Sequence, residues 1–126
     1  MAMAHASMER MEKCAHNCHE CEDACLRLIP HCLERGGEHA SAEHIGMLMD
    51  CAAICDASHS LLHRGSRLHV ETCRACAVIC EACARECAGK GPEEDACAEA
   101  CRTCAESCRE MSTSASQSVS NRQTTS

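Results

Sequence analysis

The chain has 126 residues, a formal net charge of −7, no Phe, Tyr or Trp, and 16 cysteines. This length suits one domain. The negative charge and the lack of aromatic rings argue against a nucleic-acid partner, because no basic stripe neutralises phosphates and no ring stacks on a base. Spanning a membrane takes an apolar run of about 18 residues or more, and the chain has none.

The start of the chain carries Arg10 and Lys13 after a mixed stretch of Ala, His and Met. An apolar segment of the kind found in secretory signals is missing from it. We therefore expect a cytoplasmic protein, in a compartment where thiols stay reduced.

The first predicted helix covers about residues 7–35 and ends at Gly36 and Gly37, with a kink expected at Pro30. Its cysteines recur at steps of three, four and seven residues, so they fit an arc of roughly 60° on the helix. They are Cys14, Cys18, Cys21, Cys25 and Cys32.

The second predicted helix covers residues 41–63, with Ser41 as its N-cap and Glu43 in its first turn. It carries a short thiol stripe of Cys51 and Cys55.

The third predicted helix covers residues 66–88, with Ser66 as its N-cap and Gly89 just past its end. Its five cysteines again share one face, over an arc of roughly 80°. They are Cys73, Cys76, Cys80, Cys83 and Cys87.

The fourth predicted helix covers residues 92–111, because Pro92 followed by three acidic residues is a strong helix start. It carries Cys97, Cys101, Cys104 and Cys108. Nine of the fifteen residues from Ser112 onward are Ser or Thr. Such a segment has no core-forming face, so we expect residues 112–126 to be a disordered tail.

Short connections between four amphipathic helices favour an all-α fold, an antiparallel up-down-up-down four-helix bundle with a cysteine-lined core. Leu, Ile and Val together number only 14, so Cys and the 20 Ala residues must fill the helix interfaces. Buried thiols behave as small hydrophobic groups. We expect the metal-free bundle to be only modestly stable.

Inward-facing thiols at helical spacing indicate metal binding. Soft thiolates suit Cu(I), zinc and iron–sulfur clusters. A Cu(I) ion that replaces a thiol proton leaves the net charge unchanged, whereas four thiolates around Zn²⁺ leave a local charge of −2. The stripes contain no basic residue to offset that charge. A long series of low-coordination Cu(I) sites is therefore favoured, which indicates storage.

The chain also resembles a known family. Its runs Cys14-x3-Cys18-x2-Cys21-x3-Cys25, Cys73-x2-Cys76-x3-Cys80-x2-Cys83-x3-Cys87 and Cys97-x3-Cys101-x2-Cys104-x3-Cys108 are similar to those of the bacterial copper storage proteins, in the cytosolic branch without an export signal. The resemblance covers residues 10–111. It implies a four-helix bundle, commonly a homotetramer, whose lumen binds many Cu(I) ions through thiolates, with copper donors or acceptor apoproteins as further partners.

Two histidines share the helix faces of the thiols. His44 precedes Cys51 by seven residues, and His69 precedes Cys73 by four. Each is a candidate copper ligand, and an exposed position on a terminal turn is the alternative. The predicted metal ligands are all sixteen cysteines named above and His44.

In an antiparallel bundle, one end collects His31, Cys32, His39, His44, Met47, Cys87 and Cys97. The opposite end collects Met11, His59, His69, Cys108 and Met111. The resemblance favours the first end as the copper entry, because the family has a polar mouth there. Core packing is the favoured role for Met11, Met47 and Met111.

Two other functions stay open at this point. A Zn or Cd reservoir like metallothionein would bind about one metal per two to four sulfurs, and a disulfide-stapled structural bundle would bind none. An enzyme is not expected, because the ferredoxin spacing, a redox Cys-x-x-Cys in a βαβ context, an acid/base pair and a phosphate loop are all missing.

Overall fold

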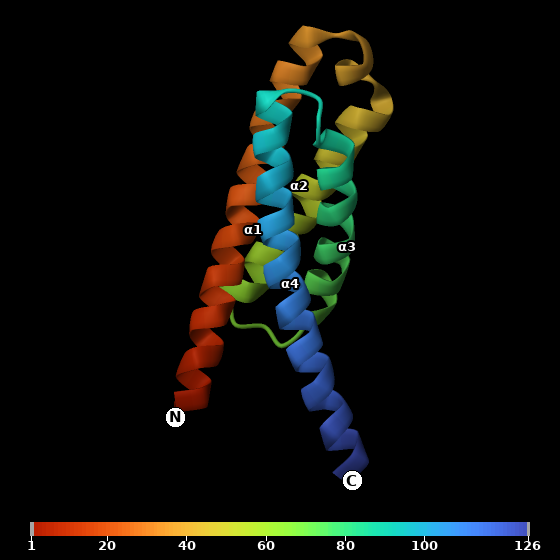
Figure 1. Ribbon diagram of the computed structural model, residues 1–126. Coiled ribbons are helices and arrows are strands. Elements are labelled where there is room, and N and C mark those ends of the chain that lie inside the picture. Colours follow the sequence, from red (N-terminus) through yellow and green to blue (C-terminus); the bar gives the residue numbers. More distant parts are fainter. Residues whose placement is uncertain (1, 126) are drawn as a thin grey trace.

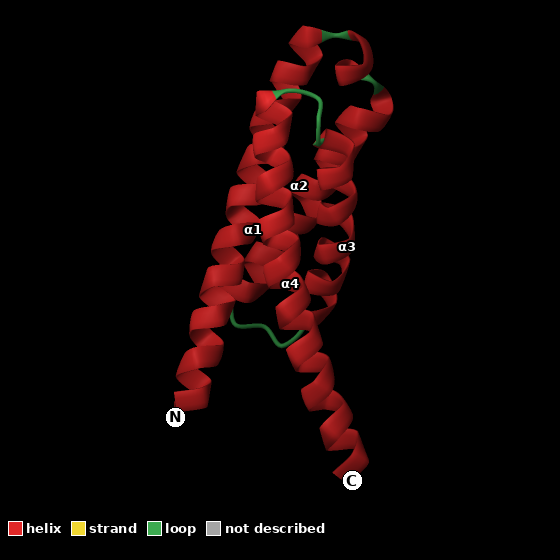
Figure 2. Cartoon of the chain, in the orientation of Figure 1, coloured by secondary structure: helices red, strands yellow, loops and turns green. Residues whose placement is uncertain are grey.

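The computed structural model describes the backbone of residues 2–125 and the side chains of residues 7–113. This part of the chain forms four α-helices and one short 3-10 helix, with no strand. They are α1 (Ala2–Arg35), η1 (Gly37–Ala40), α2 (Ala42–His63), α3 (His69–Cys87) and α4 (Pro92–Thr125). Short loops join them (Figure 2). The prediction of an all-α fold is confirmed.

The four helices alternate in direction and form a closed ring. α1 packs against α2 and α4, and α3 packs against the same two helices. Both chain ends lie at one end of the bundle, whereas η1 and the α3–α4 loop lie at the other (Figure 1). We call this second end the loop end. The antiparallel up-down-up-down bundle is thus confirmed.

Two of the predicted helix boundaries are set by the expected capping groups. The hydroxyl of Ser41 accepts a 3.1 Å hydrogen bond from the backbone N–H of His44, so Ser41 is the N-cap of α2. α1 ends where Gly36 and Gly37 take positive φ angles of 73° and 59°. These left-handed conformations favour glycine, which has no Cβ. Pro30 lies within α1, which continues past it to Arg35.

The predicted start of α3 is wrong. The helix begins at His69 rather than near Ser66, and its N-cap position is Leu68, without a side-chain cap. The hydroxyl of Ser66 accepts the N–H of Leu68, only two residues ahead, at 3.2 Å. This local contact closes a turn before the helix, so the hydroxyl does not reach the N–H groups of the first helical turn.

α4 is longer than the sequence predicts. It continues past Met111 to Thr125, where a disordered tail is expected. Ser112 is buried, and its hydroxyl donates to the carbonyl of Arg109 at 3.1 Å, so a serine can stay within this helix. The side chains from 114 to 126 lie outside the described residues, and the division of the chain into a bundle and a separate tail stays a prediction.

The core consists mainly of small side chains. Within the described residues all sixteen cysteines are buried, together with six alanines and three leucines, of which Leu48 is fully buried. Among the described helices, α2 is long and apolar enough to cross a membrane by length and composition alone. It also carries buried Cys51 and Cys55 in contact with the other helices, as a core helix of a bundle does.

Candidate metal centre

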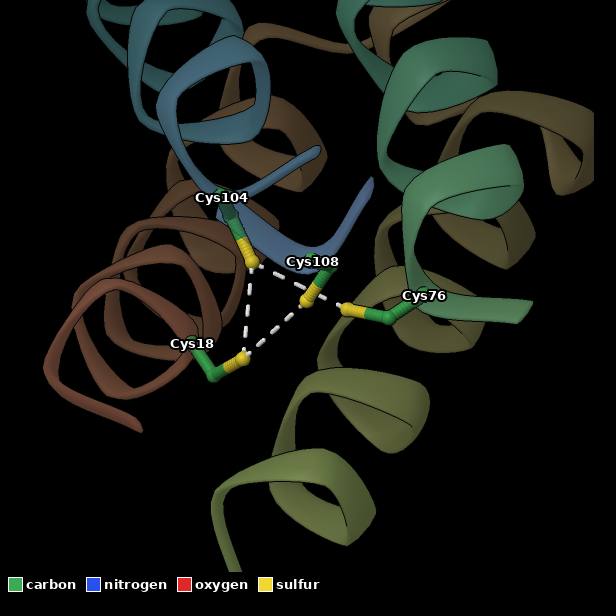
Figure 3. A group of neighbouring side chains, drawn as sticks. All are labelled: Cys18, Cys76, Cys104 and Cys108. Atoms are coloured by element: carbon green, nitrogen blue, oxygen red, sulfur yellow. Dashed lines mark hydrogen bonds between the residues drawn. The ribbon is translucent and has the colours of Figure 1, made fainter. Parts of the chain in front are cut away.

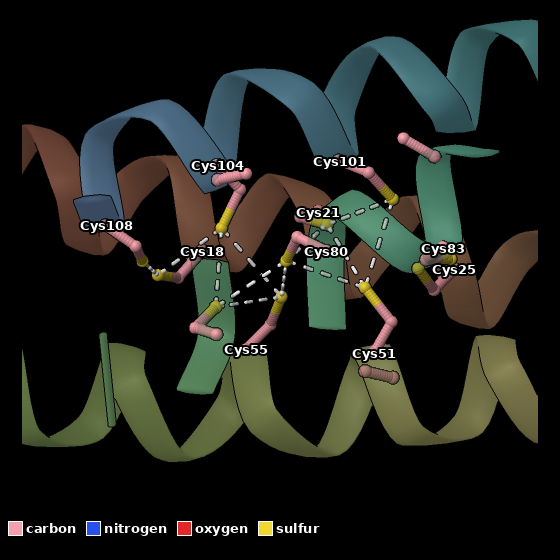
Figure 4. Packing of buried hydrophobic residues seen from close by; sticks show 14 of the residues in the cluster. Cys18, Cys21, Cys25, Cys51, Cys55, Cys80, Cys83, Cys101, Cys104 and Cys108 are labelled. Carbon is pink, nitrogen blue, oxygen red and sulfur yellow. Dashed lines mark hydrogen bonds between the residues drawn. The ribbon is translucent and has the colours of Figure 1, made fainter. Parts of the chain in front are cut away.

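The sulfur atoms of the four helices meet along the bundle axis. Fifteen cysteines have no exposed surface, and Cys97 is 2% exposed. Their side chains point from all four helices toward one another (Figure 4). This arrangement follows from the helical spacing, because residues three and four apart lie on one face. We call this row of sulfurs the thiol tube.

Sulfur contacts run without a break through most of the thiol tube. Cys108 on α4 is 3.6 Å from both Cys14 and Cys18 on α1. Cys104 is 3.7 Å from both Cys18 and Cys76. Cys80 on α3 is in turn 3.6 Å from Cys76 and from Cys55 on α2. The path continues through Cys51, Cys21 and Cys101 in steps of 3.6–3.7 Å, given by the pairs Cys51–Cys80, Cys21–Cys51 and Cys21–Cys101. A bound ion therefore always has a neighbouring sulfur within reach.

Several groups of three or four sulfurs could each hold a metal ion, because the sulfurs of a group lie within 4.8 Å of one another. The groups are Cys18/Cys76/Cys104/Cys108, Cys21/Cys25/Cys51/Cys101, Cys21/Cys55/Cys80/Cys104 and Cys14/Cys73/Cys108. Figure 3 shows the first of them, which draws sulfurs from α1, α3 and α4. Three sulfurs around an ion with bonds of about 2.3 Å lie about 4.0 Å apart. The sulfur–sulfur distances in the thiol tube are close to this value without a bound metal.

Neighbouring groups share sulfurs, which distinguishes the tube from a row of separate zinc sites. Cys21, Cys104 and Cys108 each belong to two groups. In a row of separate structural Zn²⁺ sites, each ion needs four thiolates that it does not share with the next ion. Shared sulfurs instead suit a cluster in which each thiolate bridges ions of low coordination number.

The thiols are free. All sixteen cysteines are unpaired, and the sulfur contacts given above are 3.6 Å or longer, far from the 2.05 Å of a disulfide bond. The disulfide-stapled bundle is therefore not the state that the structure describes.

The surroundings shift the pKa values of the thiols in different directions. The hydrogen bond with Cys101 lowers the pKa of Cys21 to about 6 and the pKa of Cys97 to about 5. Burial, followed by the nearby Glu94 carboxylate, raises the pKa of Cys32. Among the described residues, no Lys or Arg is buried. In this part of the chain, no fixed positive charge therefore lies among the sulfurs, and protons neutralise those whose pKa is raised.

His44 closes the loop end of the thiol tube. Its side chain is fully buried, and its Nε2 atom is 3.3 Å from the Sγ of Cys32. On the other side of the ring, Nδ1 is 3.3 Å from a carboxylate oxygen of Glu86, which Lys90 also contacts at 2.8 Å. A carboxylate on the second nitrogen is the usual way to orient a metal-binding histidine. The alternative of an exposed terminal histidine is wrong for His44.

His69 is also buried, at the opposite end. Its Nδ1 is 2.7 Å from the carbonyl of Ser66, which orients the ring. Its Nε2 is buried and has no hydrogen-bond partner. An available ring nitrogen one turn before Cys73 makes His69 a second candidate ligand, and the alternative of an exposed histidine is wrong here too.

The other histidines and the methionines near the tube differ in exposure. His16, His19 and His63 are exposed, whereas Met11 and Met47 are partly buried and Met111 is buried. These methionines pack against the core, as their predicted role requires. Sequence reasoning missed the positions of Glu86 and Glu94. Glu86 is not part of a repeating sequence pattern. Glu94 is one of three acidic residues at the start of a helix, where acidic residues are common for electrostatic reasons alone.

Comparisons with known proteins agree with this geometry. The family model described as copper storage protein matches residues 7–113. An uncharacterized cysteine-rich protein of Bacillus subtilis, YhjQ, is 40% identical over 91 residues, which are 71% of this chain and 83% of the relative.

Two solved structures are similar over most of their length. The Cu(I)-bound copper storage protein BsCsp3 is 38% identical, with a TM-score of 0.76, and the match covers 82% of this chain and 98% of that one. The cytosolic copper storage protein of Streptomyces lividans with five coppers is 32% identical, with a TM-score of 0.79, and covers 86% and 96%. The chain belongs to the copper storage protein family.

Proposed function

We propose that this protein stores Cu(I), with the thiolates of the thiol tube as ligands, and that it is not an enzyme. The observation that carries the proposal is the unbroken row of free sulfurs from four helices, 3.6–3.7 Å apart along the path described above. The proposed ligands are the sixteen cysteines and His44. Two relatives support the choice of metal, since one is Cu(I)-bound and another is loaded with 10 copper equivalents.

Charge explains why such a tube suits Cu(I). Each Cu(I) ion that displaces one thiol proton leaves the interior as neutral as before. A dication bound by four thiolates would leave two uncompensated negative charges in a region without buried Lys or Arg among the described residues. Successive dications along the tube would add to this cost, whereas successive Cu(I) ions would not.

Filling would start at the loop end and proceed inward. Cys32 and His44 offer a soft sulfur and a neutral imidazole at the outermost position, with the ring held by Glu86. An ion there would pass inward to the next sulfurs of the tube, where Cys25 and Cys97 lie 3.8 Å apart. Thiols release protons as copper binds, so affinity falls in acid.

The protein would act in the cytoplasm as a homotetramer, taking copper from donors and giving it to acceptor apoproteins. The Streptomyces lividans relative is described as cytosolic. Large apolar side chains on the outside of the bundle support self-association, because exposed apolar area is typical of interaction surfaces. They include Leu26, Leu33, Met49 and Val78, each at least 50% exposed.

A titration tests the stored metal and its amount. Fully reduced protein is titrated with Cu(I) under anaerobic conditions against a competing chromogenic chelator. We expect tight binding of about one ion per cysteine. Saturation at one to four ions would contradict storage, and a parallel Zn²⁺ titration with a higher capacity would favour the zinc reservoir.

A further inference from the structure

A second cluster of ligand atoms lies at the loop end, outside the thiol tube. Its centre is Glu94, in the first turn of α4, whose side chain has no exposed surface. Glu94 is the only Asp, Glu, Lys or Arg buried within residues 7–113. Burying a carboxylate is costly unless a positive group or hydrogen bonds offset the charge. Copper storage in the tube does not use this group.

Two histidines surround the carboxylate. His39 Nδ1 is 3.0 Å from Glu94 Oε2, and His31 Nε2 is 3.8 Å from Glu94 Oε1. None of these four buried atoms makes a hydrogen bond. Four unsatisfied polar atoms at one place are unusual, because almost all buried polar groups have partners. They lie at ion-pair distances from one another, and a metal ion between them would give all four a partner.

Cys32 completes a ligand set at this place. Its sulfur, a nitrogen of His39 and an oxygen of Glu94 all lie within 4.8 Å of one another. Atoms around a tetrahedral zinc ion lie about 3.3–3.8 Å apart, given bonds of 2.0–2.3 Å. Small side-chain shifts would therefore close the site, with His31 as a fourth ligand. The three segments that supply these residues, the end of α1, η1 and the start of α4, meet at the loop end (Figure 1).

The ligand types select a different ion from the one in the tube. A carboxylate is a hard ligand that suits divalent ions better than Cu(I), and zinc accepts sulfur, nitrogen and oxygen together. One thiolate and one carboxylate together balance a charge of +2, so the buried site would be neutral. The same ion in the tube would leave net negative charge.

We propose that Cys32, His39, Glu94 and His31 bind one Zn²⁺ ion, which ties η1 to the ends of α1 and α4. Cys32 is also the outermost sulfur of the thiol tube, 3.3 Å from His44. Zinc at this site and Cu(I) at Cys32 and His44 would therefore compete for the same sulfur. The competing explanation is a plain ion-pair network, in which Arg35, 3.5 Å from Glu94 Oε2, and protonated histidines neutralise the carboxylate.

Cobalt spectroscopy on the full chain distinguishes the two. One equivalent of Co²⁺ is added to reduced, metal-free protein under anaerobic conditions, and the sulfur-to-cobalt charge-transfer band is compared with the d–d bands. We expect d–d bands with the intensity of a tetrahedral site, a charge-transfer band with the intensity of a single thiolate, and loss of this spectrum in Glu94→Gln. The control is Glu106→Gln, because Glu106 is an exposed acid on the same helix and has no contact with the proposed ligands.

The same variants are titrated with Zn²⁺ by calorimetry, and with Cu(I) to measure capacity. Glu94→Gln should weaken the tightest Zn²⁺ site by about tenfold or more, with Cu(I) capacity near that of the parent. His39→Gln, on the half-buried η1 segment, gives an independent test if Glu94→Gln does not fold by circular dichroism. A cobalt spectrum with the intensity of several thiolates, or one unchanged in both Glu94→Gln and His39→Gln, would overturn the zinc site. Only a low Cu(I) capacity of the parent protein would count against copper storage.

Discussion

The Nε2 atom of His44 lies 3.3 Å from the Sγ of Cys32, and both side chains have no exposed surface. This pair joins the start of α2 to the end of α1 and forms the outermost soft-ligand pair of the thiol tube. The backbone N–H of His44 is fixed by Ser41 and its ring by Glu86. The imidazole is therefore held in place before copper arrives.

Replacing this histidine should affect the first steps of loading. His44→Ala should lower Cu(I) capacity by about one ion and slow the uptake of the first ions, since capture at the loop end loses its nitrogen ligand. Stopped-flow mixing with Cu(I) and a competition titration measure these two effects. His63→Ala, at the exposed far end of the same helix, is the matched control. Equal rates and capacities for both variants would remove His44 from the path.

The two cysteines of α2 should carry a definite part of the capacity. Cys51→Ala combined with Cys55→Ala should lose about two Cu(I) ions and keep its helicity, because alanine suits both the helix and the small core. Ser58→Ala controls for an unrelated change at a buried position of the same helix. Unchanged capacity in the cysteine variant would place helix α2 outside the store.

Acid should release copper unevenly. The pKa of Cys32 is raised by burial, so its thiol is protonated at neutral pH and binding there must displace a proton. Affinity at the loop end therefore rises with pH through the neutral range. The pKa of Cys97 is lowered to about 5, so this sulfur is already a thiolate above that pH.

Competition titrations between pH 5.5 and 8 measure this difference. We expect Cys32→Ser to flatten the pH dependence near neutrality, and Cys97→Ser to weaken the binding that persists at the acidic end. If Cys32→Ser changed binding only at the acidic end and Cys97→Ser only near neutrality, the assigned pKa shifts of these two thiols would be wrong.

Copper should supply stability that the small core lacks. Leu48 is one of the few large side chains in the core, and Leu48→Ala should lower the free energy of unfolding of the metal-free protein by about 2–5 kcal/mol. Filling with Cu(I) should restore much of the loss, because ligands that bind only the folded state stabilise it. Thermal melts with and without copper test this, with Leu26→Ala on the surface as the control. A melt of the variant that copper does not shift would contradict the coupling.

The cap of α2 gives a smaller and separate effect. Ser41→Ala removes the hydroxyl that accepts the N–H of His44 and should cost about 1 kcal/mol of stability. Chemical denaturation of the metal-free protein measures this cost. Ser41→Asp should retain most of the stability, since aspartate also caps helices. Equal destabilisation by both changes would contradict a capping role.

Helical periodicity explains why the bundle and the thiol tube were predictable. The spacing of Cys14, Cys18, Cys21 and Cys25 fixes their common face whatever the helix packs against. A cap motif alone is weaker evidence. Ser41 caps α2 as expected, whereas Ser66, with the same chemistry, closes a turn ahead of α3. The choice depends on the path of the loop, which the sequence pattern does not contain.

The loop end was only partly predictable for a related reason. Antiparallel packing correctly brings His31, Cys32, His39 and His44 to one end, where Cys32 contacts His44 and His39 contacts Glu94. The burial of Glu94 was not foreseen, because an acid in the first turn of a helix is normally explained by the helix dipole. Its carboxylate lies beside Arg35 at the end of α1 and His39 in η1, and the 3-10 helix has no strong sequence signal.

Because the core of this bundle is made of its proposed ligands, the free energy of unfolding can hardly be raised by placing larger apolar side chains in the core. Substituting leucine for Cys80 or Cys101 would add apolar volume where most small domains need it, and in the same step would block the lumen and remove a thiolate. Selection for a tougher fold and selection for capacity therefore act against each other at the same positions. Improvement of the scaffold is confined to the outer faces and the helix caps.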